Sequence, residues 1–154
     1  MEKKLNILFF HYAILPIKKY GGIERILFWH MKELARQGHN VYLIGNPLSQ
    51  VYQFGINLIP LQKKDLNNWE KFIPKNIDII HLSANYKPKT DIPYIITVHG
   101  NGQPGEVFPK NSVFLSKKHA ENHNATAYIY NRIDLEEYPF TPKQNQAWEN
   151  FFFL

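Results

Sequence analysis

The stretch that decides the fold runs from Lys4 to Gly45 and reads KLNILFFHYAILPIKKYGGIERILFWHMKELARQGHNVYLIG. Its first part, residues 5–10, is a nearly continuous apolar run, the pattern of a strand that is covered on both faces in a parallel sheet. A second apolar run, Val41 to Ile44, is typical of another such strand. Between the two runs, apolar residues recur at helical spacing. The stretch therefore predicts a strand, a helix and a second strand, joined by a right-handed crossover.

The expected helix has apolar positions three and four residues apart, with charged residues between them. Gly38 follows its last turn and is expected to end it. His30 lies on the apolar side and is interpreted as a core residue with satisfied hydrogen bonds. The apolar positions are Ile23, Ile26, Leu27, His30, Met31 and Leu34.

Strand and helix patterns continue to alternate along the rest of the chain. Strands are expected at 56–59, 77–82, 94–98 and 113–115, and short helices at 66–73 and at 117–123, with Ser116 as the N-cap of the second. A last segment, 127–130, closes the series. This alternation predicts an α/β fold with a Rossmann-like, doubly wound, mainly parallel sheet.

The composition is ordinary for a globular domain, with 44% hydrophobic and 20% charged residues among 154. Lys and Arg number 18 against 13 Asp and Glu, a net charge of +5, and they are spread along the chain rather than gathered into a nucleic-acid-binding block. The absence of cysteine excludes a disulfide, a thiolate metal site and a cysteine nucleophile. No apolar stretch reaches the about 20 residues that span a bilayer. We expect a cytoplasmic protein with no nucleic-acid partner, and peripheral contact with the inner face of a membrane stays open.

Candidate site residues lie in the loops that follow the expected strands, because parallel α/β sheets bind ligands beyond the carboxyl ends of their strands. Gly21 and Gly22 directly precede the helix, so they either make a tight turn into it or offer their amides to an anion such as phosphate. His99 ends a strand and starts a glycine-rich loop, which places an imidazole at this edge of the sheet.

Two other motifs carry less weight. The run from Gly100 to Gly105 matches G-x-G-x-x-G, but no amphipathic helix follows it, so a nicotinamide or flavin oxidoreductase is not favoured. His119 and His123 lie four residues apart on an expected short helix without a third ligand nearby. We interpret this pair as an exposed polar helix face and expect no metal site.

Five motifs occur in a fixed order along the chain. They are Gly21–Arg25, Leu34–Val41, Asp78–His81, Val98–Gly100 and Tyr130–Asp134. In this order they resemble the motifs of retaining glycosyltransferases of family 4, which have the GT-B architecture of two Rossmann-like domains facing each other across a cleft. The resemblance covers the chain as an N-terminal domain, with Arg132 standing where the family usually has glycine.

The resemblance implies transfer of a sugar, with retention, from a nucleotide-diphosphate sugar to a glycan or lipid-linked acceptor in polysaccharide biosynthesis. The nucleotide sugar is a co-substrate, and neither a metal nor another cofactor is implied. By this resemblance His99 is the catalytic residue and lies against the donor sugar, while Gly21 and Gly22 approach the donor phosphates. The implied acceptor or sugar contacts are Tyr20, Glu24, Gly100, Asn101 and Gly102.

The resemblance also implies a domain organisation. Residues 1–142 match the N-terminal, acceptor-side domain, and residues 143–154 match a linker and the start of a missing C-terminal donor-binding domain. The run from Phe151 to Leu154 looks like that domain's first strand, so we expect a longer protein and an inactive chain by itself. The same run offers a route to a strand-exchanged homodimer. The alternative function is a non-catalytic or truncated module that binds glycan or phosphate.

Overall fold

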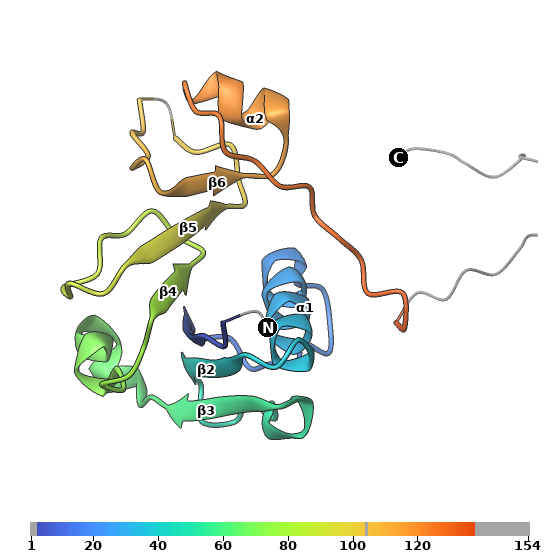
Figure 1. Cartoon of the computed structure of the whole chain (residues 1–154), viewed down its shortest axis with the longest axis vertical. Coiled ribbons are helices and arrows are strands. Elements are labelled where there is room, and N and C mark those ends of the chain that lie inside the picture. The colour runs from blue at the N-terminus through green and yellow to red at the C-terminus, as the bar shows by residue number, and fades with distance from the viewer. Residues whose placement is uncertain (1–2, 104, 138–154) are drawn as a thin grey trace, which may run out of the picture.

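In the part of the chain that the structure describes, six parallel strands form one sheet in the order β3-β2-β1-β4-β5-β6 (Figure 1). The structure is a computed structural model, and it describes residues 3–103 and 105–137. The strands are β1 (Asn6–His11), β2 (Asn40–Gly45), β3 (Ile56–Pro60), β4 (Ile79–Leu82), β5 (Tyr94–Val98) and β6 (Ser112–Phe114). The helices are α1 (Gly22–Arg36) and α2 (Lys117–Asn122), with 3-10 segments η1 (Tyr52–Phe54) and η2 (Lys63–Phe72). This order is the Rossmann order, so the predicted α/β fold with a doubly wound parallel sheet is confirmed.

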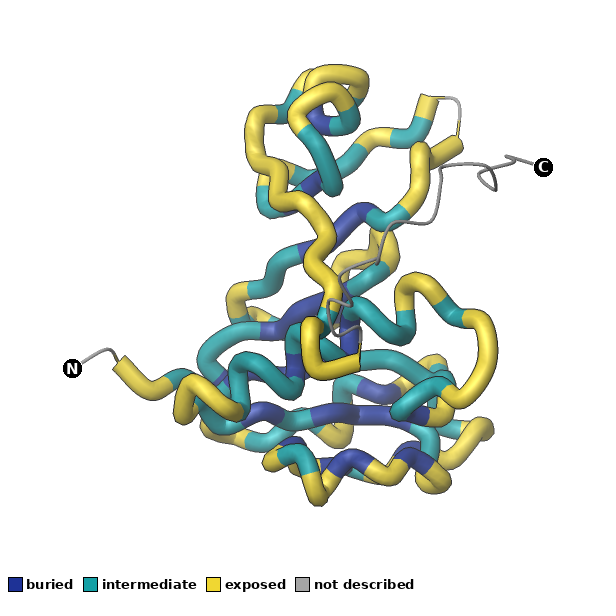
Figure 2. Tube along the Cα trace, turned by 90° about the vertical axis from the view of Figure 1, so that its right-hand side faces the viewer, coloured by how far each residue is buried: buried dark blue, intermediate teal, exposed yellow. Residues whose placement is uncertain are grey.

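The central strand β1 contributes to a separate apolar core on each face of the sheet. Ile7 and Phe9 point to the face that α1 covers, where they pack with Leu27 and Met31. Leu8 points to the other face, because successive side chains of a strand alternate. That second core also holds Trp69 of η2 and Ala120 of α2. Figure 2 shows the buried residues following the strands through the middle of the molecule.

Helix α1 ends as the sequence predicts. Gln37 is its C-cap, and Gly38 follows with φ +92°, a left-handed conformation that glycine adopts at little cost. The Gly38 amide donates to the Ala35 carbonyl at 3.0 Å, and the His39 amide donates to the Leu34 carbonyl at 3.1 Å. These two bonds form a Schellman motif, which satisfies carbonyls that the helix leaves free.

Two elements differ from the sequence prediction. In place of the regular helix predicted at 66–73, the chain forms the 3-10 segment η2, which ends at Phe72, breaks at Asn68 (φ −134°, ψ 27°) and buries Trp69. Residues 127–130 form a single parallel bridge from Tyr128 to Phe114, in place of a strand. Helix α2 begins as predicted, because the Ser116 hydroxyl accepts the His119 amide at 3.1 Å.

The exposed chain after α2 crosses from the β6 edge of the sheet to α1 (Figures 1 and 2). Its end, which we call the acidic segment 134–137, makes ionic contacts with two basic residues of α1. Lys32 Nζ donates to Asp134 at 2.9 Å and to Glu136 at 2.6 Å, and Arg25 donates to Glu137 at 3.2 Å. The predicted linker, the run from Phe151 and the strand-exchanged dimer lie outside the described residues. Within the described ranges, no helix has the length and apolar character needed to cross a membrane.

Candidate functional site

The carboxyl ends of β1, β4 and β5 meet at one edge of the sheet. Strand β1 lies between β2 and β4, so successive crossovers run in opposite directions from this point. In open parallel sheets such a switch point leaves a crevice in which ligands bind. Two cavities lie here, of about 180 Å³ and about 630 Å³, and both are lined by Ile23, Ser83 and Ala84.

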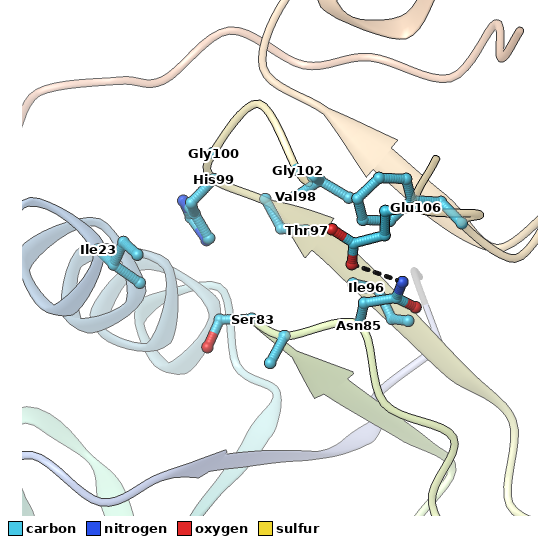
Figure 3. A pocket seen from close by; sticks show the side chains of 12 residues that line it. Ile23, Ser83, Asn85, Ile96, Thr97, Val98, His99, Gly100, Gly102 and Glu106 are labelled. Carbon is cyan, nitrogen blue, oxygen red and sulfur yellow. Dashed lines mark hydrogen bonds between the residues drawn. The ribbon is translucent and has the colours of Figure 1, made fainter. Parts of the chain in front are cut away.

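The smaller cavity lies at the end of β5 and holds His99 (Figure 3). His99 follows Val98, the last residue of the strand, and its ring points toward the first turn of α1, where Ile23 lies. Both ring nitrogens are shielded from solvent, and neither has a hydrogen-bond partner among the described residues. Gly100 and Gly102 also line this cavity. The site thus presents an imidazole whose hydrogen-bonding capacity is unused.

Burial is the main cause that lowers the pKa of His99 to about 4, and the charges of His30 and His11 add to it. The carboxylate of Glu24 opposes the shift without reversing it. The ring is therefore neutral at pH 7. A neutral imidazole has one nitrogen that donates and one that accepts, so it can pair with both roles of a ligand hydroxyl.

His99 belongs to a group of four histidines on the α1 face of the sheet, which we call the histidine cluster: His11, His30, His81 and His99. The buried His81 shares a 2.7 Å hydrogen bond between its Nε2 and Thr97 Oγ1, and its ring centroid lies 6.1 Å from that of His30. Burial and the neighbouring histidines lower the pKa of His81 to about 3. Burial also lowers the pKa of His30, as does the nearby charge of Arg132. The cluster is thus uncharged at neutral pH.

Gly21 and Gly22 stand at the N-terminus of α1, as the sequence predicts. The place beside Gly21 is filled: a Cβ there would lie 2.9 Å from Glu24 Oε2 and 3.0 Å from Ile17 Cδ1. Glu24 also pairs with His11, at 3.7 Å between Oε1 and Nε2. Space is open at Gly22, where a Cβ would meet nothing within 4 Å. An anion that bound at Gly21 would therefore meet a carboxylate already stationed on the first turn.

The structure brings only part of the predicted site together. His99, Gly100 and Gly102 line one cavity. Five other candidates line neither cavity: Tyr20, Gly21, Gly22, Glu24 and Asn101. The side chain of Tyr20 is 98% exposed.

Glu106 and the larger cavity are features that the sequence did not reveal. Glu106 accepts the Asn85 side-chain amide at 2.8 Å and the Gln103 backbone amide at 2.9 Å, so it ties the loop after β4 to the loop after β5. The larger cavity includes Trp69, which comes from the crossover between β3 and β4. No sequence motif joins these residues. The sequence offered one signal for this cavity: Phe10 and Tyr12 are aromatic residues two positions apart at the end of the first strand, so they lie on the same face.

The pair of His119 and His123 is not the exposed polar face that the sequence suggested. His123 lies just past the end of α2, and its ring stacks on Phe114 with centroids 5.2 Å apart. The ring of His119 packs edge-on against the same phenylalanine, at 5.0 Å. Both side chains are half-buried because their rings pack against Phe114 of β6. Within the described part of the chain, no three His, Cys, Asp or Glu residues are grouped so as to hold a metal ion.

Fold and site together define a Rossmann-like α/β domain with a ligand crevice at its strand ends. No family model matches the chain, and comparisons with curated proteins and with solved structures find no match either. The resemblance to family 4 glycosyltransferases therefore stays a prediction from the sequence.

Proposed function

We propose that this chain is the N-terminal, acceptor-side domain of a retaining GT-B glycosyltransferase. The enzyme would transfer a sugar from a nucleotide-diphosphate sugar to a glycan or lipid-linked acceptor. Support comes from the ordered motifs of the sequence on a sheet of Rossmann order. Cytoplasmic location, with or without peripheral membrane contact, is part of the same proposal.

The observation that carries the proposal is the environment of His99. Its imidazole lies at a strand end beside Gly100, in a cavity, with both nitrogens shielded and unpartnered among the described residues. A buried polar group without a partner is costly, so such a group at a ligand crevice is best explained by a ligand that pairs with it. A sugar hydroxyl supplies both an acceptor and a donor for a neutral ring.

In this proposal each residue has a defined task. His99 hydrogen-bonds a hydroxyl of the donor sugar and fixes the orientation of the sugar. Gly100, where a Cβ would meet nothing within 4 Å, lets the sugar approach the backbone. The amides at Gly21 and Gly22 face the donor phosphates, which requires Glu24 to turn away from the first turn of α1.

The test measures sugar transfer and donor hydrolysis by the intact gene product on a panel of nucleotide-diphosphate sugars. His99→Ala is expected to lower turnover about 100-fold, the usual effect of removing one preorganised polar contact from a reacting centre. His39→Ala is the matched control, because His39 lies at the opposite edge of the sheet and accepts the Leu5 amide at 3.2 Å. Undiminished turnover in His99→Ala would remove this residue from the site.

A second candidate is a non-catalytic module that binds a glycan or another ligand without transferring it. The position of Glu24 favours this candidate, because its carboxylate lies beside Gly21, where the donor phosphate is expected. Calorimetry with UDP-glucose separates the two. Binding that Glu24→Gln tightens supports the donor site, whereas ligand binding without any turnover in the intact gene product supports the module.

A further inference from the structure

The larger cavity lies beside the His99 cavity, on the η2 side of the carboxyl edge. Its volume is about 630 Å³, within the range typical of sites for small organic ligands. The two cavities have Ile23, Ser83 and Ala84 in common, so they adjoin at these residues. None of the donor or acceptor contacts that the family resemblance implies lines the larger cavity.

Most of its lining is apolar or aromatic. Phe10 and Trp69 stack with ring centroids 4.4 Å apart and an angle of 6° between their planes, which makes a rigid wall. Leu66, Leu82 and Tyr12 add to the apolar surface. Among the described residues, the polar side chains in the lining are His11, Tyr12, Asn67, Ser83, Tyr86 and Lys89, and none of these residues lining the cavity is Asp or Glu.

The one cationic side chain in the described lining, Lys89, has a carboxylate near it. Burial lowers the pKa of His11 more than the nearby Glu24 raises it, so this ring is neutral at pH 7. Lys89 has Glu70 beside it: its backbone amide donates to Glu70 at 3.2 Å, and its charge helps to lower the pKa of that carboxyl. The Tyr86 hydroxyl is likewise engaged, because it donates to Glu70.

We propose that the larger cavity binds an uncharged alcohol with an apolar body, and that the hydroxyl of this ligand points past Ser83 toward His99. The proposal rests on the proposed function only in naming this alcohol the acceptor. A glycan would bring many hydroxyls onto aromatic and aliphatic side chains, where they would lack hydrogen-bond partners. An anion at Lys89 would also meet the negative charge of the nearby Glu70 carboxylate. An apolar body with one hydroxyl matches the lining and leaves that hydroxyl in reach of the reacting centre.

Equilibrium dialysis of the full chain at pH 7 tests the chemical class with three probes: 2-naphthol, 2-naphthyl phosphate and maltotriose. We expect 2-naphthol to bind, and the phosphate and the trisaccharide to bind at least about tenfold more weakly. Equal or tighter binding of either competitor would overturn the proposal, as would failure of 2-naphthol to bind.

Two filling variants test the location. Ala84 and Asn67 both line the cavity and are exposed, so Ala84→Phe and Asn67→Phe occupy it without disturbing the core. Each is expected to weaken 2-naphthol binding about tenfold, because the added ring takes the place of the ligand. Ala127→Phe is the matched control, since Ala127 is exposed and lines neither cavity. Unchanged affinity in both filling variants would overturn the location.

The dialysis requires no sugar donor, so its outcome is independent of the transfer assay. If the filling variants weaken 2-naphthol binding and the intact gene product transfers no sugar, the inference stands and the proposed enzyme activity is refuted. If sugar transfer is observed but 2-naphthol does not bind in the cavity, the proposed enzyme activity stands and this inference is refuted. Thermal unfolding of each variant confirms that it is folded.

Discussion

Gly45 is a position near the site where the sheet leaves no room for a side chain. It pairs with His11 across β1 and β2, and a Cβ on Gly45 would lie 2.7 Å from the His11 carbonyl oxygen. The obstacle is the backbone of the central strand β1, so it has little room to move. We expect Gly45→Ala to lower the free energy of unfolding by about 1–3 kcal/mol, the usual cost of overpacking. Urea unfolding measures this free energy. Gly22→Ala is the control, because a Cβ at Gly22 would meet nothing within 4 Å. Equal stability of the two variants would contradict the prediction.

The histidine cluster makes stability depend on pH. The pKa values of His81 and His99 are about 3 and about 4 in the folded chain, against 6.5 for a free imidazole. Below pH 6.5 the unfolded chain therefore binds protons that the folded chain does not, and the free energy of unfolding falls as the pH falls. The slope is up to about 1.4 kcal/mol per pH unit for each such histidine.

Replacement of His81 isolates its share of that slope. His81→Gln keeps a polar group near Thr97 but cannot titrate, so its stability is expected to fall less steeply between pH 6.5 and pH 4 than that of the wild type. Urea unfolding at several pH values measures the two slopes. At pH 7.5 His81 is neutral in the folded and in the unfolded chain. The difference in unfolding free energy between variant and wild type at this pH therefore measures the packing change alone. Identical slopes would show that His81 is as easily protonated in the folded chain as in the unfolded one.

At the scale of elements, the acidic segment 134–137 is held to α1 by polar contacts that are exposed or partly buried. Lys32 lies between Asp134 and Glu136, and its hydrogen bonds to these carboxylates raise its pKa to about 12. Each exposed ion pair contributes little, about 0–1 kcal/mol, and salt screens it. The segment is therefore expected to separate from α1 while the fold stays intact.

Lys32→Met tests this separation. Amide exchange of Glu137, whose amide donates to the Asp134 carbonyl at 3.1 Å, is expected to accelerate, and the unfolding free energy is expected to fall by no more than about 1 kcal/mol. High salt should likewise accelerate the amide exchange of Glu137 in the wild type, because it screens the ion pairs. Lys117→Met removes a comparable exposed pair, 4.0 Å from Glu121 in α2, and should leave the Glu137 exchange unchanged. Exchange in Lys32→Met as slow as in the wild type would contradict the ionic attachment.

The elements that the sequence predicted best are those whose signal is local. Strand β5 has the predicted bounds Tyr94–Val98, and the caps at Ser116 and Gly38 lie where their residue types indicate. The predictions failed where long-range packing decides. Trp69 enters the core against Phe10, which bends η2 at Asn68, and Tyr128 meets only one residue of β6.

At the scale of the whole molecule, the site shows the same contrast between features with a local sequence signal and features that depend on long-range packing. His99 was predictable because a histidine between a strand and a glycine lies at the carboxyl edge of any parallel sheet. The larger cavity was not predictable, since it forms only when η2 brings Trp69 beside the end of β1. The charge state of the histidine cluster was hidden for the same reason, because burial between the sheet and α1 sets it.

The sheet also couples its two cores. Leu27 is buried in the core on the α1 face and Ile80 in the core on the other face, while β1 supplies residues to both. Leu27→Ala should lower the unfolding free energy by about 2–5 kcal/mol through loss of buried methyl groups and the cavity left behind. Because neither core closes without β1, this one change is expected to shift the whole transition, with an unchanged denaturant slope.

Far-UV circular dichroism follows the sheet, and tryptophan fluorescence includes Trp69 in the opposite core. Ile80→Ala is the reciprocal variant. Midpoints that move together in both variants establish one cooperative unit, whereas a fluorescence transition that Leu27→Ala leaves in place would divide the molecule into two.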